Sequence, residues 1–177
     1  MFIKKFFKKS RITIDDNYDI FDALWSSPAT MPNVDDAISD EEIVEKIKNM
    51  SDLELTDDED RTLLMNAVIY ERPLVVECLL KRGVDINKSD CNGFTALHFA
   101  VQTNNHNIIK MLLKAGISVN VKNKFGNNAI FLADNNTAVE TIELLLQYGS
   151  DPHQKNNHGF SAMEVLSSDL RYSHLLK

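Results

Sequence analysis

Histidine and cysteine are the residues of this sequence best suited to metal binding, acid–base catalysis or nucleophilic chemistry, and it has five of the first and two of the second. Cys78 and Cys91 form no CxxC pair, and two thiols alone define no metal site. The histidines share no metal-ligand spacing, and the sequence has neither a glycine-rich phosphate loop nor a nucleophile elbow. His98 is the most tempting catalytic residue, but a single histidine without a positioned partner makes no acid–base site. We therefore predict no catalytic residue, metal site or cofactor, and expect no small-molecule substrate.

Charged residues are divided unevenly along the chain, whose formal net charge is −7. Residues 1–11 carry five bases and no acid, residues 15–60 carry sixteen acids and two lysines, and residues 61–177 carry twelve bases and ten acids. A chain whose excess acid lies in one block is a poor nucleic-acid binder, but it can attract a basic protein surface. We expect a protein partner with a basic surface, and no nucleic acid.

No apolar run approaches the roughly 20 residues that a membrane-spanning helix needs. The basic start "MFIKKFFKKSR" lacks the apolar stretch of a signal peptide, and the two cysteines show no pairing pattern, so we expect a cytoplasmic protein. On a helix this segment would place its phenylalanines on one face and its lysines opposite. It could rest on an anionic membrane, form a flexible tail or pack against the acidic block, and we favour the last two.

A 33-residue period organises most of the chain. The glycines form two series with this spacing, Gly93, Gly126 and Gly159, and Gly83, Gly116 and Gly149. Each unit has a polar turn, a weak apolar helix pattern such as "TALHFAVQ" and a stronger one such as "NIIKMLLKAG". The stronger pattern places Ile108, Ile109, Leu112 and Leu113 on one helical face, and Gly116 follows where a helix ends in a left-handed residue. Because two helices this short cannot bury both faces alone, the units must stack on one another.

The motifs within the period resemble those of the ankyrin-repeat family. "DCNGFTALHFA" at 90–100 is similar to the family pattern D-x-x-G-x-T-P-L-H-x-A, with Ala96 in place of proline, and "LLKAGISVN" is similar to L-L-x-x-G-A-D-V-N. The histidine of this pattern is replaced by Met65 and Phe131 in the flanking units, and the turn glycine of the first unit by Asp60. The resemblance implies that His98 is structural, with its ring bonding to backbone between neighbouring repeats.

The resemblance also implies the architecture, which is an all-α ankyrin-repeat solenoid of paired antiparallel helices with turn or β-hairpin fingers, about four units plus caps. The expected divisions are a basic N-terminal tail at 1–11, acidic N-terminal capping helices at 12–56, ankyrin repeats at 57–89, 90–122 and 123–155, and a C-terminal capping repeat at 156–177. Within the acidic cap, residues 16–27 would form a first helix. Residues 39–55 would hold a second helix, which begins with the capping-box spacing of Ser39 and Glu42.

Partner-facing positions follow from the same resemblance, which implies that they lie around the turn glycine, at the end of the first helix and before the second glycine. Large aromatic side chains there are typical of interface hot spots, although some rings could instead cover the core edge between units. The acidic run at 57–60 could equally be a solvated face. The candidate partner-binding residues are Asp58, Glu59, Arg61, Tyr70, Arg82, Asn92, Phe94, Gln102, Thr103, Lys124, Phe125, Asn127, Asn135, Tyr148, His158 and Phe160.

These features together predict a non-catalytic protein-binding module rather than an enzyme. Because the repeats account for most of the sequence, inhibition of a partner by occlusion is the favoured mechanism. The acidic block and the family resemblance favour an immunity protein that neutralises a basic toxin. The alternative is an adaptor or scaffold protein held weakly at a membrane surface by its basic N-terminal segment.

Overall fold

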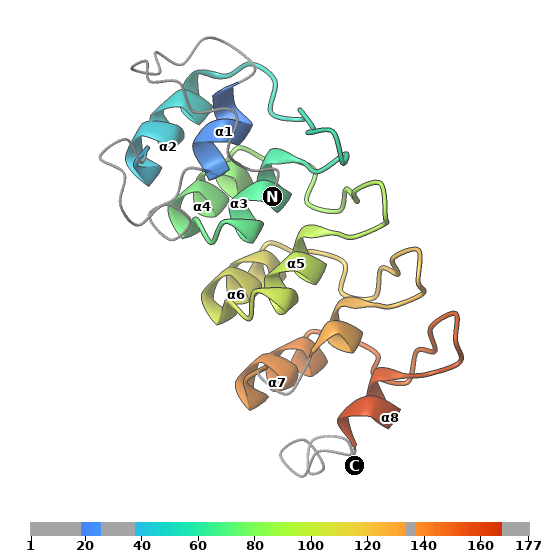
Figure 1. The fold of residues 1–177 in the computed structure, drawn as a ribbon. Helices are drawn as coiled ribbons and strands as arrows, with labels where there is room; N and C mark the ends of the chain where they lie inside the picture. Colours follow the sequence, from blue (N-terminus) through green and yellow to red (C-terminus); the bar gives the residue numbers. More distant parts are fainter. Residues whose placement is uncertain (1–18, 26–37, 134–136, 168–177) are drawn as a thin grey trace, which may run out of the picture.

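Two columns of short helices form the molecule in a computed structural model that describes residues 19–25, 38–133 and 137–167 (Figure 1). One column holds the second helix of each pair, α2 (Asp40–Asn49), α4 (Pro73–Lys81), α6 (His106–Lys114) and α7 (Val139–Gln147). The other holds α3 (Leu63–Ile69), α5 (Ala96–Gln102), the 3₁₀ turn η1 (Ala129–Leu132) and α8 (Ala162–Leu166), while α1 (Asp19–Trp25) lies beside α2. Helices account for all the regular elements of the described residues, which confirms the predicted all-α solenoid.

The second helices begin at residues 40, 73, 106 and 139, so the 33-residue period of the sequence is the spacing of the stack. The helix α2 keeps this register, and it starts with the predicted capping box. In that box the Glu42 amide donates to Ser39 Oγ at 3.2 Å, and the Ser39 amide donates to the Glu42 carboxylate at 3.0 Å. The two bonds satisfy backbone donors that the helix itself leaves unpaired.

Hydroxyl side chains start the first helices at the same spacing. Thr62 accepts the Met65 amide at 3.2 Å and Ser161 accepts the Glu164 amide at 3.3 Å, while Thr95 forms a capping box with His98. At the corresponding place in the third unit, Asn128 gives no side-chain cap.

The third unit departs from the pattern. Residues 123–155 were expected to carry two helices, and in place of the first helix the described residues form only the 3₁₀ turn η1. The Asn128 side-chain amide donates to the Asp151 carbonyl at 2.9 Å instead of capping a helix. Phe131, which stands where His98 stands one unit earlier, cannot complete a capping box. The missing cap explains why the apolar pattern alone yields a single short turn.

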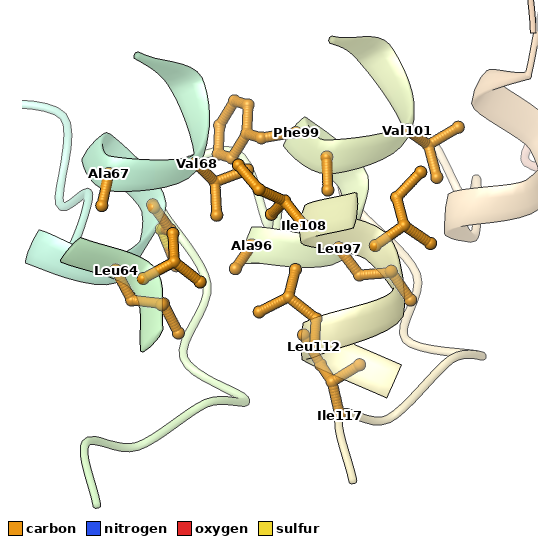
Figure 2. Packing of buried hydrophobic residues seen from close by; sticks show 14 of the residues in the cluster. Leu64, Ala67, Val68, Ala96, Leu97, Phe99, Val101, Ile108, Leu112 and Ile117 are labelled. Atoms are coloured by element: carbon orange, nitrogen blue, oxygen red, sulfur yellow. The ribbon is translucent and has the colours of Figure 1, made fainter. Parts of the chain in front are cut away.

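A continuous apolar core lies between the two columns (Figure 2). Leu64 and Val68 of α3 face α5, whose Leu97 packs toward Ile108 and Leu112 of α6. Ile108, Ile109 and Leu112 are fully inaccessible to solvent and Leu113 is 2% exposed, which confirms the predicted apolar face. The core therefore runs along the stack, and each pair of helices is buried by its neighbours.

Four fingers project from the side of the molecule opposite the second helices (Figure 1). They are finger 1 (57–61), finger 2 (90–94), finger 3 (123–127) and finger 4 (156–160), and antiparallel bridges such as Thr56–Thr62 close the bases of fingers 1, 2 and 4. In each finger the first side chain, Asp57, Asp90, Asn123 or Asn156, accepts the backbone amides two and four residues later. These bonds fix the shape of every finger without a regular strand.

Candidate functional site

Backbone hydrogen bonds join the fingers into one row. The Cys91 amide donates to the Glu59 carbonyl at 3.0 Å, the Lys124 amide to the Asn92 carbonyl at 2.9 Å, and the Asn157 amide to the Phe125 carbonyl at 3.0 Å. We call the exposed side chains of fingers 1 to 4 the finger face. Because each finger is bonded to the next, the finger face is a surface of fixed spacing.

A second set of hydrogen bonds joins neighbouring units just before the fingers in the sequence. The Asn87 side chain accepts the Ser118 amide at 2.9 Å, and the Asn120 side chain accepts the Asp151 amide at 2.8 Å. At the N-terminal end of the stack, Glu54 takes the place of asparagine and accepts the Asp85 amide at 3.0 Å. Side-chain acceptors spaced by 33 residues therefore link each unit to the next, in addition to the backbone bonds between the fingers.

Finger 1 is the acidic end of the finger face. Asp58 and Asp60 are exposed and make no ion pair among the residues that the structure describes. Glu59 pairs with Arg61, whose guanidinium carbon lies 5.5 Å from the centre of the Phe99 ring. Arg61 is thus engaged by Glu59 of its own finger and by the Phe99 ring of α5. The negative charges of Asp58 and Asp60 are therefore not neutralised by Arg61.

Exposed aromatic rings mark the other end of the finger face. Phe125 of finger 3 is 53% exposed and Phe160 of finger 4 is 58% exposed. Phe94 of finger 2 is half-buried instead, because its ring stacks on Phe99 with centroids 5.6 Å apart and meets Phe125 edge-on at 6.5 Å. Phe94 therefore covers the core edge between units, whereas Phe125 and Phe160 offer apolar area to a partner.

The remaining finger candidates are polar. Asn92, Lys124 and His158 are exposed, and Asn127 is half-buried with its backbone carbonyl used by His98. These residues occupy similar positions in successive fingers, which recur every 33 residues. The structure therefore brings them onto one row with Asp58 and Glu59.

Other candidates lie at helix ends. Arg82 closes α4 and donates to the carbonyls of Ile47 at 2.7 Å and Met50 at 2.9 Å, so its guanidinium holds the end of α2. Tyr148 closes α7 and is 41% exposed.

Tyr70, Gln102 and Thr103 lie where first helices end. Tyr70 is half-buried, and this burial raises the pKa of its hydroxyl. Gln102 is exposed, and the Thr103 hydroxyl donates to the Ala100 carbonyl at 3.2 Å. Asn135 lies outside the described residues, as do the tail at 1–11 and the end of the chain at 168–177.

His98 occupies a structural position, as the sequence predicted. Its ring is buried, and its Nε2 lies 3.1 Å from the Asn127 carbonyl of the next unit. Because a carbonyl only accepts, Nε2 donates that bond, and Nδ1 is left to accept the Thr95 amide at 3.0 Å. Burial lowers the pKa of His98, which favours this neutral ring.

Arg72 is a buried charged residue that the sequence did not single out. Its side chain is 2% exposed, and its guanidinium donates to the carbonyls of Leu24, Ala23 and Ile38. It also pairs with the Asp40 carboxylate, so one side chain joins α1, α2 and the first repeat. The sequence offered one clue to its importance, which is its position in the repeat. Arg72 lies 33 residues before Asn105, and both residues stand at the start of a second helix.

A family model described as ankyrin repeats (3 copies) matches residues 36–123. The match begins before α2, so it includes the helix that the sequence assigned to a cap, and it ends within finger 3. The search of curated proteins found no match. Among the described residues, every helix is too short or too polar to cross a membrane, and no three side chains of His, Cys, Asp or Glu gather as a metal site.

Proposed function

The chain belongs to the ankyrin-repeat family and is therefore a protein-binding module, and we propose that it binds its partner through the finger face. The observation that carries this proposal is the bonded row of fingers, which presents uncompensated carboxylates at one end and exposed phenylalanines at the other. A rigid surface loses little conformational entropy on binding. Exposed aromatic rings supply the apolar area on which hot spots depend.

We further propose that the part of the partner over finger 1 is basic. Asp58 and Asp60 carry charge that no described residue neutralises, and their field would attract a positive surface before contact. The proposed contact residues are those finger-face candidates that expose side chains, Asp58, Glu59, Asn92, Lys124, Phe125, His158 and Phe160.

Occlusion of the partner is the mechanism that we favour. The described residues offer a binding surface, and no three of their His, Cys, Asp or Glu side chains gather to hold a metal, so we propose binding as the activity. An immunity protein that covers the active surface of a basic toxin is the specific form of this proposal. The unpaired Cys78 and Cys91 support a reducing, cytoplasmic setting.

The experiment is affinity capture with the full chain, followed by mass spectrometry of what is retained. The matched pair of baits is Asp58→Lys with Glu59→Lys on finger 1, and Glu77→Lys with Glu143→Lys on the outer helices α4 and α7, since both pairs change the net charge equally. A partner retained by wild type and by the outer-helix variant, but lost by the finger 1 variant, is the expected result. Equal retention by both variants would refute binding at finger 1.

Two further measurements separate the parts of the proposal. Phe125→Ala should weaken binding by at least about 2 kcal/mol in calorimetry, the usual threshold of a hot spot. Inhibition is tested by the activity of the captured partner with and without the chain. A partner that keeps full activity when saturated would exclude occlusion and leave the adaptor role.

A further inference from the structure

Charge changes sign along the finger face. Finger 1 exposes the three carboxylates of residues 58–60, finger 2 exposes the uncharged Cys91 and Asn92, and finger 3 exposes Lys124. Lys122 is exposed directly before finger 3, where its Nζ donates to the Lys155 carbonyl at 2.9 Å. Neither lysine makes an ion pair among the described residues. From finger 1 to finger 3 the row is therefore negative, then neutral, then positive, and finger 4 carries no lysine, arginine or carboxylate.

A row of this kind is complementary to a copy of itself that runs in the opposite direction, because each end then meets the opposite charge. We propose that two copies of the chain pair through their finger faces about a two-fold axis at finger 2. Finger 1 of each copy then lies against finger 3 of the other. A two-fold interface uses the same patch on both copies, so both charge contacts form at once.

The overall charge of the molecule favours this face over others. With a net charge of −7, two copies repel one another at long range. The finger face offers positive groups to the carboxylates of a second copy, and it places Phe125 beside Lys124, where a second copy would cover the ring. Because exposed ion pairs contribute little individually, the expected dimer is weak and concentration-dependent.

Pairing of two copies would cover the same carboxylates that the proposed partner uses. The inference goes beyond the proposed function and does not depend on it, since a second copy can be tested without any partner. It adds a regulatory consequence, because a partner would have to displace the second copy from finger 1. Self-association would then set the concentration range over which the chain is available for binding.

Sedimentation of purified full-length chain tests the proposal through charge reversal. The acidic finger 1 is reversed by Asp58→Lys with Glu59→Lys, and the basic finger 3 by Lys124→Glu with Lys122→Glu. We expect wild type to dimerise at concentrations between about 10 μM and 1 mM, and each variant alone to dimerise about tenfold more weakly or worse. An equimolar mixture of the two variants should recover the wild-type affinity, because each reversed end then meets a reversed complement.

The same measurements can overturn the proposal. A wild type that stays monomeric up to about 1 mM, or a dimer that neither reversal weakens, would exclude pairing through the finger face. A mixture of two folded variants that stays as weak as the separate variants would also exclude it, because folded chains with complementary reversed ends should pair. Thermal unfolding of each variant identifies any that fails to fold.

Cys91 tests where the axis lies. It is exposed on finger 2, so two copies should bring their thiols together and a short bis-maleimide should link them. The control is Ala115→Cys in a Cys91→Ser chain, which places an exposed thiol at the end of α6. Linkage at Cys91 that exceeds the control and falls in the charge-reversed variants is expected. Equal linkage at both positions would reject an axis at finger 2.

Discussion

Arg72 Nη1 lies 2.6 Å from Asp40 Oδ1, at a place where the arginine side chain is 2% exposed. The same guanidinium donates to the carbonyls of Leu24 and Ala23 at the end of α1. A buried charge is tolerated only when such partners satisfy it. Arg72 therefore joins both N-terminal helices to the repeats through a single buried side chain.

Replacing Arg72 with methionine should destabilise the N-terminal end of the stack. The change leaves Asp40 and three carbonyls without their donor, and removing one member of a buried ion pair typically costs about 3–5 kcal/mol. Urea unfolding measures the loss, and hydrogen exchange should show it concentrated in residues 19–25 and 38–50. Arg82→Met is the control, because its guanidinium also binds α2 carbonyls but is exposed, so the expected cost is about 1 kcal/mol. Equal costs for the two variants would contradict the special role of burial.

Gly126→Ala should cost more stability than Gly159→Ala, although both residues have φ near +80°. The shared backbone conformation penalises any L side chain by about 1–2 kcal/mol. A Cβ at Gly126 would also lie 2.7 Å from the Asn157 amide nitrogen of finger 4, whereas nothing lies within 4 Å of one at Gly159. We expect a further penalty of about 1–3 kcal/mol at Gly126, as for other overpacked sites. Chemical unfolding of the two variants measures the difference, and equal values would mean that the fingers can separate without cost.

The stability of the fold should fall in mild acid because of His98. Burial holds the pKa of His98 below its unfolded value, so the unfolded chain binds more protons as the pH drops below about 6.5. This contribution is fully present above the unfolded pKa and is lost as the pH falls toward the folded pKa. A protonated Nδ1 would also point a donor at the Thr95 amide.

His98→Gln isolates this effect from other titrating groups. Glutamine does not titrate near neutral pH, and it can complete a capping box with Thr95. The unfolding free energy of wild type minus that of the variant should decrease as the pH falls from about 7 to about 5. A difference that stays constant over that range would show that His98 does not titrate with unfolding.

The acidic end of the finger face should act mainly on the rate of association with the captured partner. Exposed charges add little affinity singly, but their summed field attracts a partner before contact, and salt screens it over roughly 8–10 Å. Raising the salt concentration should therefore slow association more than it speeds dissociation. Asp58→Lys with Glu59→Lys should associate slowly even at low salt. Stopped-flow measurement of association at two salt concentrations tests this prediction. A wild-type association rate that does not change with salt would show that finger 1 is only a solvated surface.

The 33-residue period predicted the positions of the helices better than it predicted the roles of individual side chains. Glycine spacing and apolar faces located the second helices, because these features are set by local geometry, and the structural role of His98 was implied by the resemblance to the family pattern. The shortened first helix at η1 depends on one missing cap at Asn128, which an apolar pattern does not reveal. Arg72 escaped notice because its burial arises from α1 and α2, which are distant in sequence.

The exposure of the candidate residues could be predicted only in part. At the family's partner-facing positions, Phe125 and Phe160 are exposed in the structure. Whether Phe94 faces solvent or the core depends on the neighbouring Phe99, and Arg82 is engaged by carbonyls of α2. Such tertiary contacts have no signature in the residue itself.

The hydrogen bonds between fingers would allow the stack to be lengthened by whole repeat units. Fingers 2 and 3 each donate one amide to the finger before and offer one carbonyl to the finger after. A tandem duplication of residues 90–122 would therefore find the same bonding groups at its one new junction, where Cys91 of the second copy would donate to Asn92 of the first. Length in this architecture can change by whole units, whereas an insertion of any other size would leave one finger without its neighbour.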